Sequence, residues 1–367
     1  MNPGNRQFAS MAFLWPALAA EATSELVAAT AREFAKLAVG PDTNEANGRE
    51  PQWTTRNKIA LELPAVRLRD FSTRREWATT LVCAPFALHG ATVVDFAAGH
   101  SLVAALLSAG TNRVFVTDWR SATAEMRFWS IDDYLAALNV LVDELGGAVD
   151  LIGLCQGGWM ALVYAARFPA KVRKLVLAGA PIDIAAGKSR LSELTNNTPS
   201  SVFTELVELG NGRVLGHQLL QFWAPELEPG EIHRLLEPAD AMESEPFRRL
   251  ESRFDDWYAW TVNLPGTYYL QVVGQLFKEN RLAGGKFVAL GRRVDLSKLH
   301  CPLFLLAARD DDIVAPEQIF ATKHLIDYGH CTVTKAIAPC GHLGLFMGRN
   351  ILSTVWPDIA RWLSQPA

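Results

Sequence analysis

Two patterns of apolar residues alternate along most of the chain, continuous short runs and residues at helical spacing. Short apolar runs typical of buried strands occur at residues 79–87, 113–118, 149–154, 174–178, 302–308 and 332–337. Apolar residues at helical spacing predict helices at residues 101–109, 131–145, 157–168, 317–326 and 350–363. Strands that alternate with helices form βαβ units, so the pattern predicts an α/β fold with a mostly parallel sheet.

The alternation stops between residues 184 and 285, where the pattern is helical and offers no convincing buried strand. The aromatic residues of this stretch include Trp223, Trp257, Trp260, Tyr268 and Tyr269. We therefore expect a core of residues 58–183 and 286–367, interrupted by a helical insertion of residues 184–285. The aromatic side chains suit an apolar acyl channel, although such stripes more often serve packing alone.

Residues 1–57 precede the expected core. An apolar run at 11–20 ends in small residues, as a signal peptide does, but it is short and contains Pro16. It continues into apolar residues at helical spacing, followed by a linker-like segment at 38–57. We expect an N-terminal helical arm and linker of a cytoplasmic protein, with a signal peptide as the alternative. No apolar run reaches the roughly 18 residues that span a bilayer, so we expect no integral membrane insertion.

Composition and charge exclude several classes of protein. The chain has 367 residues, of which 49% are hydrophobic and 20% charged, which excludes collagen-like, coiled-coil and disordered proteins. Its net charge of −4 provides no field that would recruit nucleic acid. Five cysteines without CxxC spacing argue against a disulfide framework and a zinc site, and favour a reducing compartment.

The segment GLCQGG lies between a predicted strand and a predicted helix and contains Cys155. A nucleophile elbow requires this context, because small residues two positions on either side of the nucleophile let strand and helix approach closely. Gly153 and Gly157 occupy those positions. Cys155 is therefore the candidate nucleophile. The alternative is a buried, inert cysteine, as we expect for Cys83 and Cys301.

A thiol nucleophile needs a base, and the base needs an orienting carboxylate. In the α/β-hydrolase arrangement the acid and then the histidine follow the nucleophile in the chain. Three aspartates at 310–312 follow the predicted strand 302–308, and His342 lies in a glycine-flanked loop after 332–337. The pattern leaves open which aspartate is the acid, since one or two of them suit a solvated turn. For His342 the alternative is a capping or core histidine.

An oxyanion hole would use the backbone N–H of Gln156 and a second N–H near Ala87, from the loop after the first core strand. His89 and His100 flank this region and are candidates for substrate contacts. The helical insertion would lie over Cys155 as a lid.

The chain resembles the polyhydroxyalkanoate synthase family, cysteine-dependent α/β-hydrolase-fold acyltransferases that polymerise 3-hydroxyacyl-CoA. The resemblance covers roughly residues 78–350 in the expected order. Its segments are VFVTDWRSA, IDDYLAAL, GLCQGG, FPAKVRKLVLAGAPID, NLPGTYYLQVVGQLFKENRL, GRRVDLSKLHCPLFLLAARDDDIVAP and APCGHLGLF.

The resemblance implies roles for residues and partners. Cys155 would be the acyl-accepting nucleophile, Asp311 the catalytic aspartate and His342 the general base. The implied substrate is an (R)-3-hydroxyacyl-CoA and the product a polyester chain, with no cofactor and no metal. The length resembles the short synthase subunits, which implies an accessory subunit or a homodimer, in the cytoplasm or at the surface of polymer granules.

Two departures from the family's pattern keep other functions open. Asp312 stands where synthases commonly carry His after the catalytic aspartate, and residues 86–91 read FALHGA where an Asn and paired Tyr are usual. One alternative is a polyester or thioester hydrolase that uses the same cysteine, with water as the final acceptor. Another is a non-catalytic, granule-associated partner protein.

Overall fold

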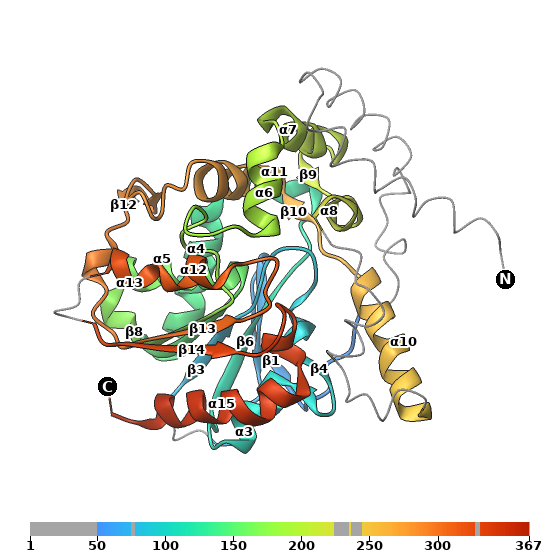
Figure 1. The fold of residues 1–367 in the computed structure, drawn as a ribbon, viewed down its shortest axis with the longest axis vertical. Helices are drawn as coiled ribbons and strands as arrows, with labels where there is room; N and C mark the ends of the chain where they lie inside the picture. The colour runs from blue at the N-terminus through green and yellow to red at the C-terminus, as the bar shows by residue number, and fades with distance from the viewer. Residues whose placement is uncertain (1–49, 75–77, 224–234, 236–243, 327–330, 367) are drawn as a thin grey trace.

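A computed structural model describes residues 50–74, 78–223, 235, 244–326 and 331–366. An eight-stranded sheet forms its centre (Figure 1). The strands are β1 (Lys58–Glu62), β2 (Val66–Asp70), β3 (Thr80–Cys83), β6 (Val114–Trp119), β7 (Val149–Leu154), β8 (Val172–Ala178), β13 (Leu303–Ala308) and β14 (Val333–Ala338). Their order is β1-β2-β6-β3-β7-β8-β13-β14. From β6 to β14 all pairs are parallel, while β1 and β2 are antiparallel, so the predicted mostly parallel sheet is confirmed.

Helices cover both faces of the sheet (Figure 1). They are α3 (Leu102–Ser108), α4 (Ile131–Glu144), α5 (Gln156–Arg167), α12 (Pro316–Phe320), α13 (Thr322–Leu325), α14 (Gly344–Met347) and α15 (Arg349–Ser364). Every residue of β7 and β13 is buried, as expected for parallel strands covered on both sides. Successive side chains enter opposite apolar layers: Leu151 packs with residues of α4 and α5, and Ile152 with residues of α3 and α15.

Short elements complete the core. They are the 3₁₀ helices η4 (Ala91–Val94), η5 (Ala124–Met126), η6 (Pro169–Lys171) and η9 (Leu296–Lys298), and the strand pairs β4 (Asp95–Ala97) with β5 (His100–Ser101) and β11 (Val288–Ala289) with β12 (Arg292–Arg293).

The predicted strand at 79–87 is too long, since β3 ends at Cys83. Beyond this point, side chains replace the backbone hydrogen bonds between strands. The N–H of Ala84 donates to Thr117 Oγ1 at 3.0 Å, and Trp119 Nε1 donates to the carbonyl of Ala84 at 3.0 Å. Pro85 then has no N–H to continue the pairing. Residues 84–90 are therefore a loop at the carboxyl end of β3.

Within the described residues, the insertion contains helices and a small strand pair. The helices are α6 (Arg190–Asn197), α7 (Ser200–Leu209), α8 (Gly216–Trp223), α10 (Glu245–Ala259), α11 (Gly266–Gln271) and the π-helix η8 (Val272–Lys278). The buried strands β9 (Arg213–Val214) and β10 (Leu264–Pro265) pair with each other, so the expectation of no buried strand in this stretch was wrong. Strands of two residues are too short to leave a periodic pattern in the sequence.

Residues 1–49 of the expected N-terminal arm lie outside the described residues. Residues 50–57 contain no helix or strand and lead into β1. The boundaries assigned to arm, core and lid stay predictions.

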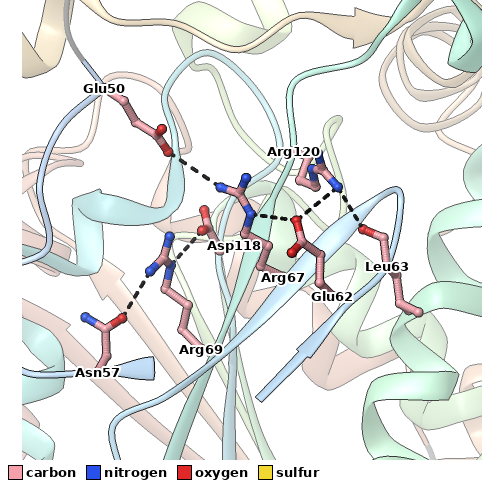
Figure 2. Close-up of polar contacts among 8 residues, drawn as sticks. All are labelled: Glu50, Asn57, Glu62, Leu63, Arg67, Arg69, Asp118 and Arg120. Carbon is pink, nitrogen blue, oxygen red and sulfur yellow. Dashed lines mark hydrogen bonds and ion pairs between the residues drawn. The ribbon is translucent and has the colours of Figure 1, made fainter. Parts of the chain in front are cut away.

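A polar network joins the antiparallel end of the sheet (Figure 2). Arg69 of β2 donates from Nε to Asp118 of β6 at 2.7 Å and from Nη1 to Asn57 at 3.1 Å. Beside this pair, Arg67 donates to Glu62 at 3.1 Å and also faces Glu50, and Arg120 pairs with Glu62 at 3.2 Å. The network links β1, β2 and β6 on the side of the sheet remote from β13 and β14 (Figures 1 and 2).

Candidate active site

Cys155 occupies a sharp turn between β7 and α5. Its backbone has φ 49° and ψ −118°, a conformation that L-residues rarely adopt. Two backbone hydrogen bonds hold the turn, from the N–H of Cys155 to the carbonyl of Ala178 at 2.9 Å and from the N–H of Gly158 to the carbonyl of Cys155 at 2.8 Å. Such strain persists only where the surroundings enforce it, and it concentrates at functional sites.

Three glycines allow this turn to pack. A Cβ on Gly153 would lie 2.7 Å from the Cβ of Ala161, and a Cβ on Gly157 would overlap the carbonyl of Cys83. A Cβ on Gly158 would overlap the Cβ of Ala180. The strand, the helix and the neighbouring strand end therefore approach too closely for any side chain, which is the geometry that the GLCQGG pattern predicts.

His342 and Asp311 lie in loops at the carboxyl ends of two adjacent parallel strands, β14 and β13. The Nδ1 of His342 lies 2.7 Å from Oδ2 of Asp311. The other carboxylate oxygen, Oδ1, accepts the N–H groups of Ile313 at 3.0 Å and Val314 at 2.9 Å. The side chain of Asp311 is 0% exposed. Its carboxylate is therefore buried from solvent and is held by three hydrogen bonds.

The three aspartates have different environments. Asp310 and Asp312 are exposed, and within the described residues Asp311 is the one of the three that is hydrogen-bonded to His342. Asp312 lies at the rim of the cavity, where its carbonyl accepts the N–H of Arg190 at 2.7 Å. Of the aspartates that the sequence left open, Asp311 is thus the one that the structure brings to the histidine.

The electrostatics of His342 connect it to both partners. Burial by itself would lower the pKa of His342, but the carboxylate of Asp311 and the sulfur of Cys155 outweigh it, and the pKa lies well above its ordinary value. Because Nδ1 faces Asp311, the interaction with the sulfur of Cys155 falls to Nε2. The imidazole therefore lies between a carboxylate and a thiol, the arrangement that a general base needs.

The other four cysteines are poor nucleophiles. Burial raises the pKa of Cys83, Cys301 and Cys340 to about 12, and that of Cys331 to about 11. A thiol with such a pKa provides little thiolate near neutral pH.

An apolar cavity of about 1000 Å³ opens beside these groups. Its wall includes Cys155, His342 and Asp312 from the core, and many apolar side chains from the insertion. Those from the insertion include Leu219, Trp223, Trp257, Tyr269, Val272, Val273 and Phe277. The cavity therefore joins a polar wall, which carries the candidate catalytic groups, to an apolar wall that suits an acyl chain.

The candidate oxyanion residues both line this cavity. Gln156 is the first residue of α5, so its backbone N–H stands at the helix N-terminus, and its side-chain oxygen accepts a hydrogen bond from Trp159 Nε1 at 2.7 Å. Ala87 lies in the loop after β3. Their roles as donors stay a prediction.

The two histidines proposed for substrate contacts differ. His89 lines the cavity. His100 is 0% exposed, faces the carbonyl of Met347 through Nδ1 at 2.8 Å, and is not part of the cavity wall. The expectation for His100 thus fails, because its position beside the loop in sequence does not bring it to the cavity.

Gln318 of α12, which the sequence analysis missed, ties the insertion to the loop that carries Asp311. Its Oε1 accepts the N–H of Ala315 at 3.1 Å and its Nε2 donates to the carbonyl of Ile184 at 3.0 Å. Ser189, next to α6, lies 3.3 Å from the same Oε1. A lone Gln in an amphipathic pattern gives no signal of such a role.

Within the described ranges, no three His, Cys, Asp or Glu side chains come together as a metal site would require. Among the helices of these ranges, none is long and apolar enough to cross a membrane.

A strained nucleophile turn on the central strand, followed in the chain by an acid and a histidine at later strand ends, defines an α/β-hydrolase-fold protein with a thiol at its elbow. Solved structures agree on the fold. The monoacylglycerol lipase of Paleococcus ferrophilus superposes with a TM-score of 0.53 at 16% identity, over 81% of this chain and 98% of the lipase. This likeness concerns the fold alone.

Sequence relatives identify the family. A family profile described as "Protein of unknown function (DUF3141)" matches residues 65–359. The poly(3-hydroxyalkanoate) polymerase subunit PhaC of Synechocystis sp. is 32% identical over 286 residues, 74% of each chain. The PhaC subunit of Allochromatium vinosum is 27% identical, over 74% of this chain and 77% of its own. The chain belongs to the poly(3-hydroxyalkanoate) polymerase family and to the DUF3141 family, which confirms the resemblance.

Proposed function

We propose that this protein is a cysteine-dependent acyltransferase that polymerises (R)-3-hydroxyacyl-CoA and releases CoA. The observation that carries the proposal is the contact of His342 with Asp311 at 2.7 Å on one side and with Cys155 at its strained elbow on the other. The names of the relatives, polymerase subunits for poly(3-hydroxyalkanoate), supply the substrate class.

The first step would exchange one thioester for another. His342 Nε2 takes the proton of the Cys155 thiol, and the sulfur attacks the carbonyl carbon of the hydroxyacyl-CoA. The N–H groups of Gln156 and Ala87 would stabilise the oxyanion. The C–S bond to CoA then breaks, the proton passes from His342 to the departing CoA sulfur, and the acyl group remains on Cys155.

The second step would form the ester bond. His342 accepts the proton of the 3-hydroxyl of an incoming hydroxyacyl-CoA, and the hydroxyl oxygen attacks the acyl group on Cys155. The bond to Cys155 breaks and the sulfur recovers its proton from the imidazole. Asp311 holds the imidazole with its proton on Nδ1 throughout. Repetition lengthens the chain, because each product is again a CoA thioester that Cys155 can attack.

The cavity supports this assignment by its two walls. The apolar wall from the insertion offers room for acyl chains, while the polar wall carries the reacting groups. An accessory subunit or a second copy of the chain, and attachment to polymer granules, belong to the same proposal.

A product assay tests the function. Purified protein is mixed with 3-hydroxybutyryl-CoA, with and without an accessory subunit, and both CoA release and the acyl product are followed. Polymer supports the synthase, and free hydroxy acid indicates a thioester hydrolase instead. Absence of CoA release in both conditions rejects the thioester mechanism.

A Cys155→Ala variant separates the enzyme from a non-catalytic partner protein. We expect it to abolish both CoA release and the covalent acyl adduct that intact-protein mass spectrometry should detect on the wild type. Granule formation in cells that survives this substitution would favour the non-catalytic, granule-associated role.

A further inference from the structure

His89 is a cavity residue that the mechanism above does not use. It lies in the loop after β3, two positions beyond Ala87, and its ring packs against two aromatic rings of α10. The ring centroids are 4.5 Å from that of Trp257 and 5.0 Å from that of Tyr258. The N–H of Val262 donates to the carbonyl of Leu88 at 2.9 Å, which fixes this loop to the insertion. The orientation of His89 is therefore set by groups from both parts of the chain.

The hydrogen bonding of the ring fixes its tautomer. Nδ1 lies 3.2 Å from the carbonyl oxygen of Trp260. A carbonyl oxygen only accepts, so the proton of the neutral ring is on Nδ1, and Nε2 keeps a lone pair. Among the residues that the structure describes, none is hydrogen-bonded to Nε2. Within the described residues, His89 thus lines the cavity and has an acceptor nitrogen without a donor.

The electrostatics make this nitrogen an acceptor and not a base. Burial lowers the pKa of His89 to about 4, and the hydrogen bond to Trp260 only partly opposes this. A group with such a pKa is neutral at pH 7 and takes up protons weakly, so it suits binding and not proton transfer. His342 differs in this respect, because a carboxylate stabilises its charged form.

We propose that Nε2 of His89 accepts a hydrogen bond from the 3-hydroxyl of the acyl group and thereby selects 3-hydroxyacyl over unsubstituted acyl thioesters. The assignment rests on the proposed function for the identity of the substrate. Near its carbonyl, such a substrate offers two kinds of donor, the 3-hydroxyl on the acyl side and an amide N–H on the CoA side. The contact of His89 with Trp257, part of the apolar wall, favours the acyl side.

Two thioesters and two variants test this selection. 3-Hydroxybutyryl-CoA and butyryl-CoA differ in the hydroxyl alone, so the ratio of their kcat/KM values for CoA release measures its recognition. The amide of His89→Gln extends to the position of Nε2 and offers an acceptor there, whereas that of His89→Asn reaches only the position of Nδ1. We expect His89→Asn to lower the ratio by about tenfold, the value of one hydrogen bond, and His89→Gln to restore most of it.

The same ratio can be measured without turnover. Calorimetry gives the affinities of the two thioesters for Cys155→Ala protein, alone and combined with His89→Asn. If Cys155→Ala protein binds the hydroxylated thioester more tightly and His89→Asn removes this preference, the role of His89 is supported. This conclusion holds even if the wild type releases no CoA, because that result would reject only the proposed function.

Three outcomes would overturn the assignment. An unchanged ratio with unchanged kcat/KM values in His89→Asn means that Nε2 does not contact the substrate. An equal loss with both thioesters means that Nε2 serves the amide on the CoA side. An equal change of the ratio in His100→Asn, a histidine with a similar Nδ1 contact but outside the cavity wall, means that the effect is a general consequence of altered packing.

Discussion

Two histidines in the wall of one cavity behave in opposite ways. Both His342 and His89 use Nδ1 to meet an oxygen acceptor, at 2.7 Å and 3.2 Å. Burial acts on both rings to disfavour the charged form. Yet the pKa of His342 lies well above its ordinary value, and that of His89 is lowered to about 4.

The difference comes from the partner of Nδ1. Asp311 offers a carboxylate that two backbone N–H groups support, and it raises the pKa of His342. The carbonyl of Trp260 is a dipole without net charge, and it does not offset the loss of water around His89. Burial alone therefore does not decide how a buried histidine titrates, because the charge of its hydrogen-bond partner sets the direction of the pKa shift.

The largest expected effect is that of Asp311→Asn, which gives His342 a neutral partner like that of His89. The amide nitrogen of Asn can donate to Nδ1, which would move the ring proton to Nε2 and prevent it from accepting the proton of Cys155. We expect CoA release from 3-hydroxybutyryl-CoA to slow by roughly 10³- to 10⁴-fold. Initial rates over a range of substrate concentrations provide the measurement.

Asp312→Asn is the matched control for that substitution. Asp312 adjoins Asp311 in the chain and lines the same cavity, but it is exposed. We expect its substitution to change the rate far less. Comparable losses in both variants would contradict the assignment of Asp311 and indicate a shared effect of negative charge at the rim.

The two histidines also differ in how far the sequence predicts them. His342, Asp311 and Cys155 each follow a buried strand in a local pattern, so the fold brings them together once the parallel sheet is recognised. The tautomer of His89 depends on Trp260, 171 positions away, and no local pattern encodes that contact. Gln318 is hidden for the same reason, since its amide donates to the carbonyl of Ile184, 134 positions away.

Exposure explains the strands that the pattern did not predict. β1 reads KIALE, and four of its five residues are exposed, so it gives no buried-strand signal. β2 pairs with β6 in antiparallel register and contributes arginines to the network in Figure 2. Buried parallel strands are conspicuous in a sequence, whereas an edge hairpin held partly by ion pairs is not.

The second-largest expected effect is the contribution of His89 to the pH dependence of the free energy of unfolding. In the unfolded chain His89 would titrate near pH 6.5, but in the folded protein its pKa is about 4. Between these values the unfolded state binds more protons, so this site lowers the free energy of unfolding as the pH falls from 7 to 4. We expect a contribution of at most about 3 kcal/mol, which His89→Gln should remove. His342 acts in the opposite direction, because its contribution is lost as the pH rises.

Urea unfolding of wild type and His89→Gln at pH 7 and pH 4.5 measures this difference directly. Other groups titrate in both proteins and cancel in the comparison. The same substitution at the exposed His324 should leave the pH dependence of the wild type unchanged. Parallel behaviour of wild type and His89→Gln would contradict the lowered pKa.

The smallest expected effect concerns a carboxylate outside the cavity, whose pKa also depends on burial and on the charge of its partner. Burial raises the pKa of Asp118, and the charge of Arg69 at 2.7 Å opposes this (Figure 2). Arg69→Met keeps the aliphatic stem but removes the charge, so the folded-state pKa of Asp118 should rise further. A carboxylate with a raised pKa costs stability as the pH rises through that value, so the loss should be about 1–2 kcal/mol at pH 7 and smaller at pH 5. Arg67→Met should cost less than about 1 kcal/mol, because its ion-pair partners Glu62 and Glu50 are exposed and its charge lowers the pKa of Asp118 less than that of Arg69 does. Urea unfolding at the two pH values measures the free energy of unfolding of both variants. Equal losses would show that the burial of the partner carboxylate does not determine the strength of the Arg69–Asp118 ion pair. Burial is also the property that separates His89 from a surface histidine.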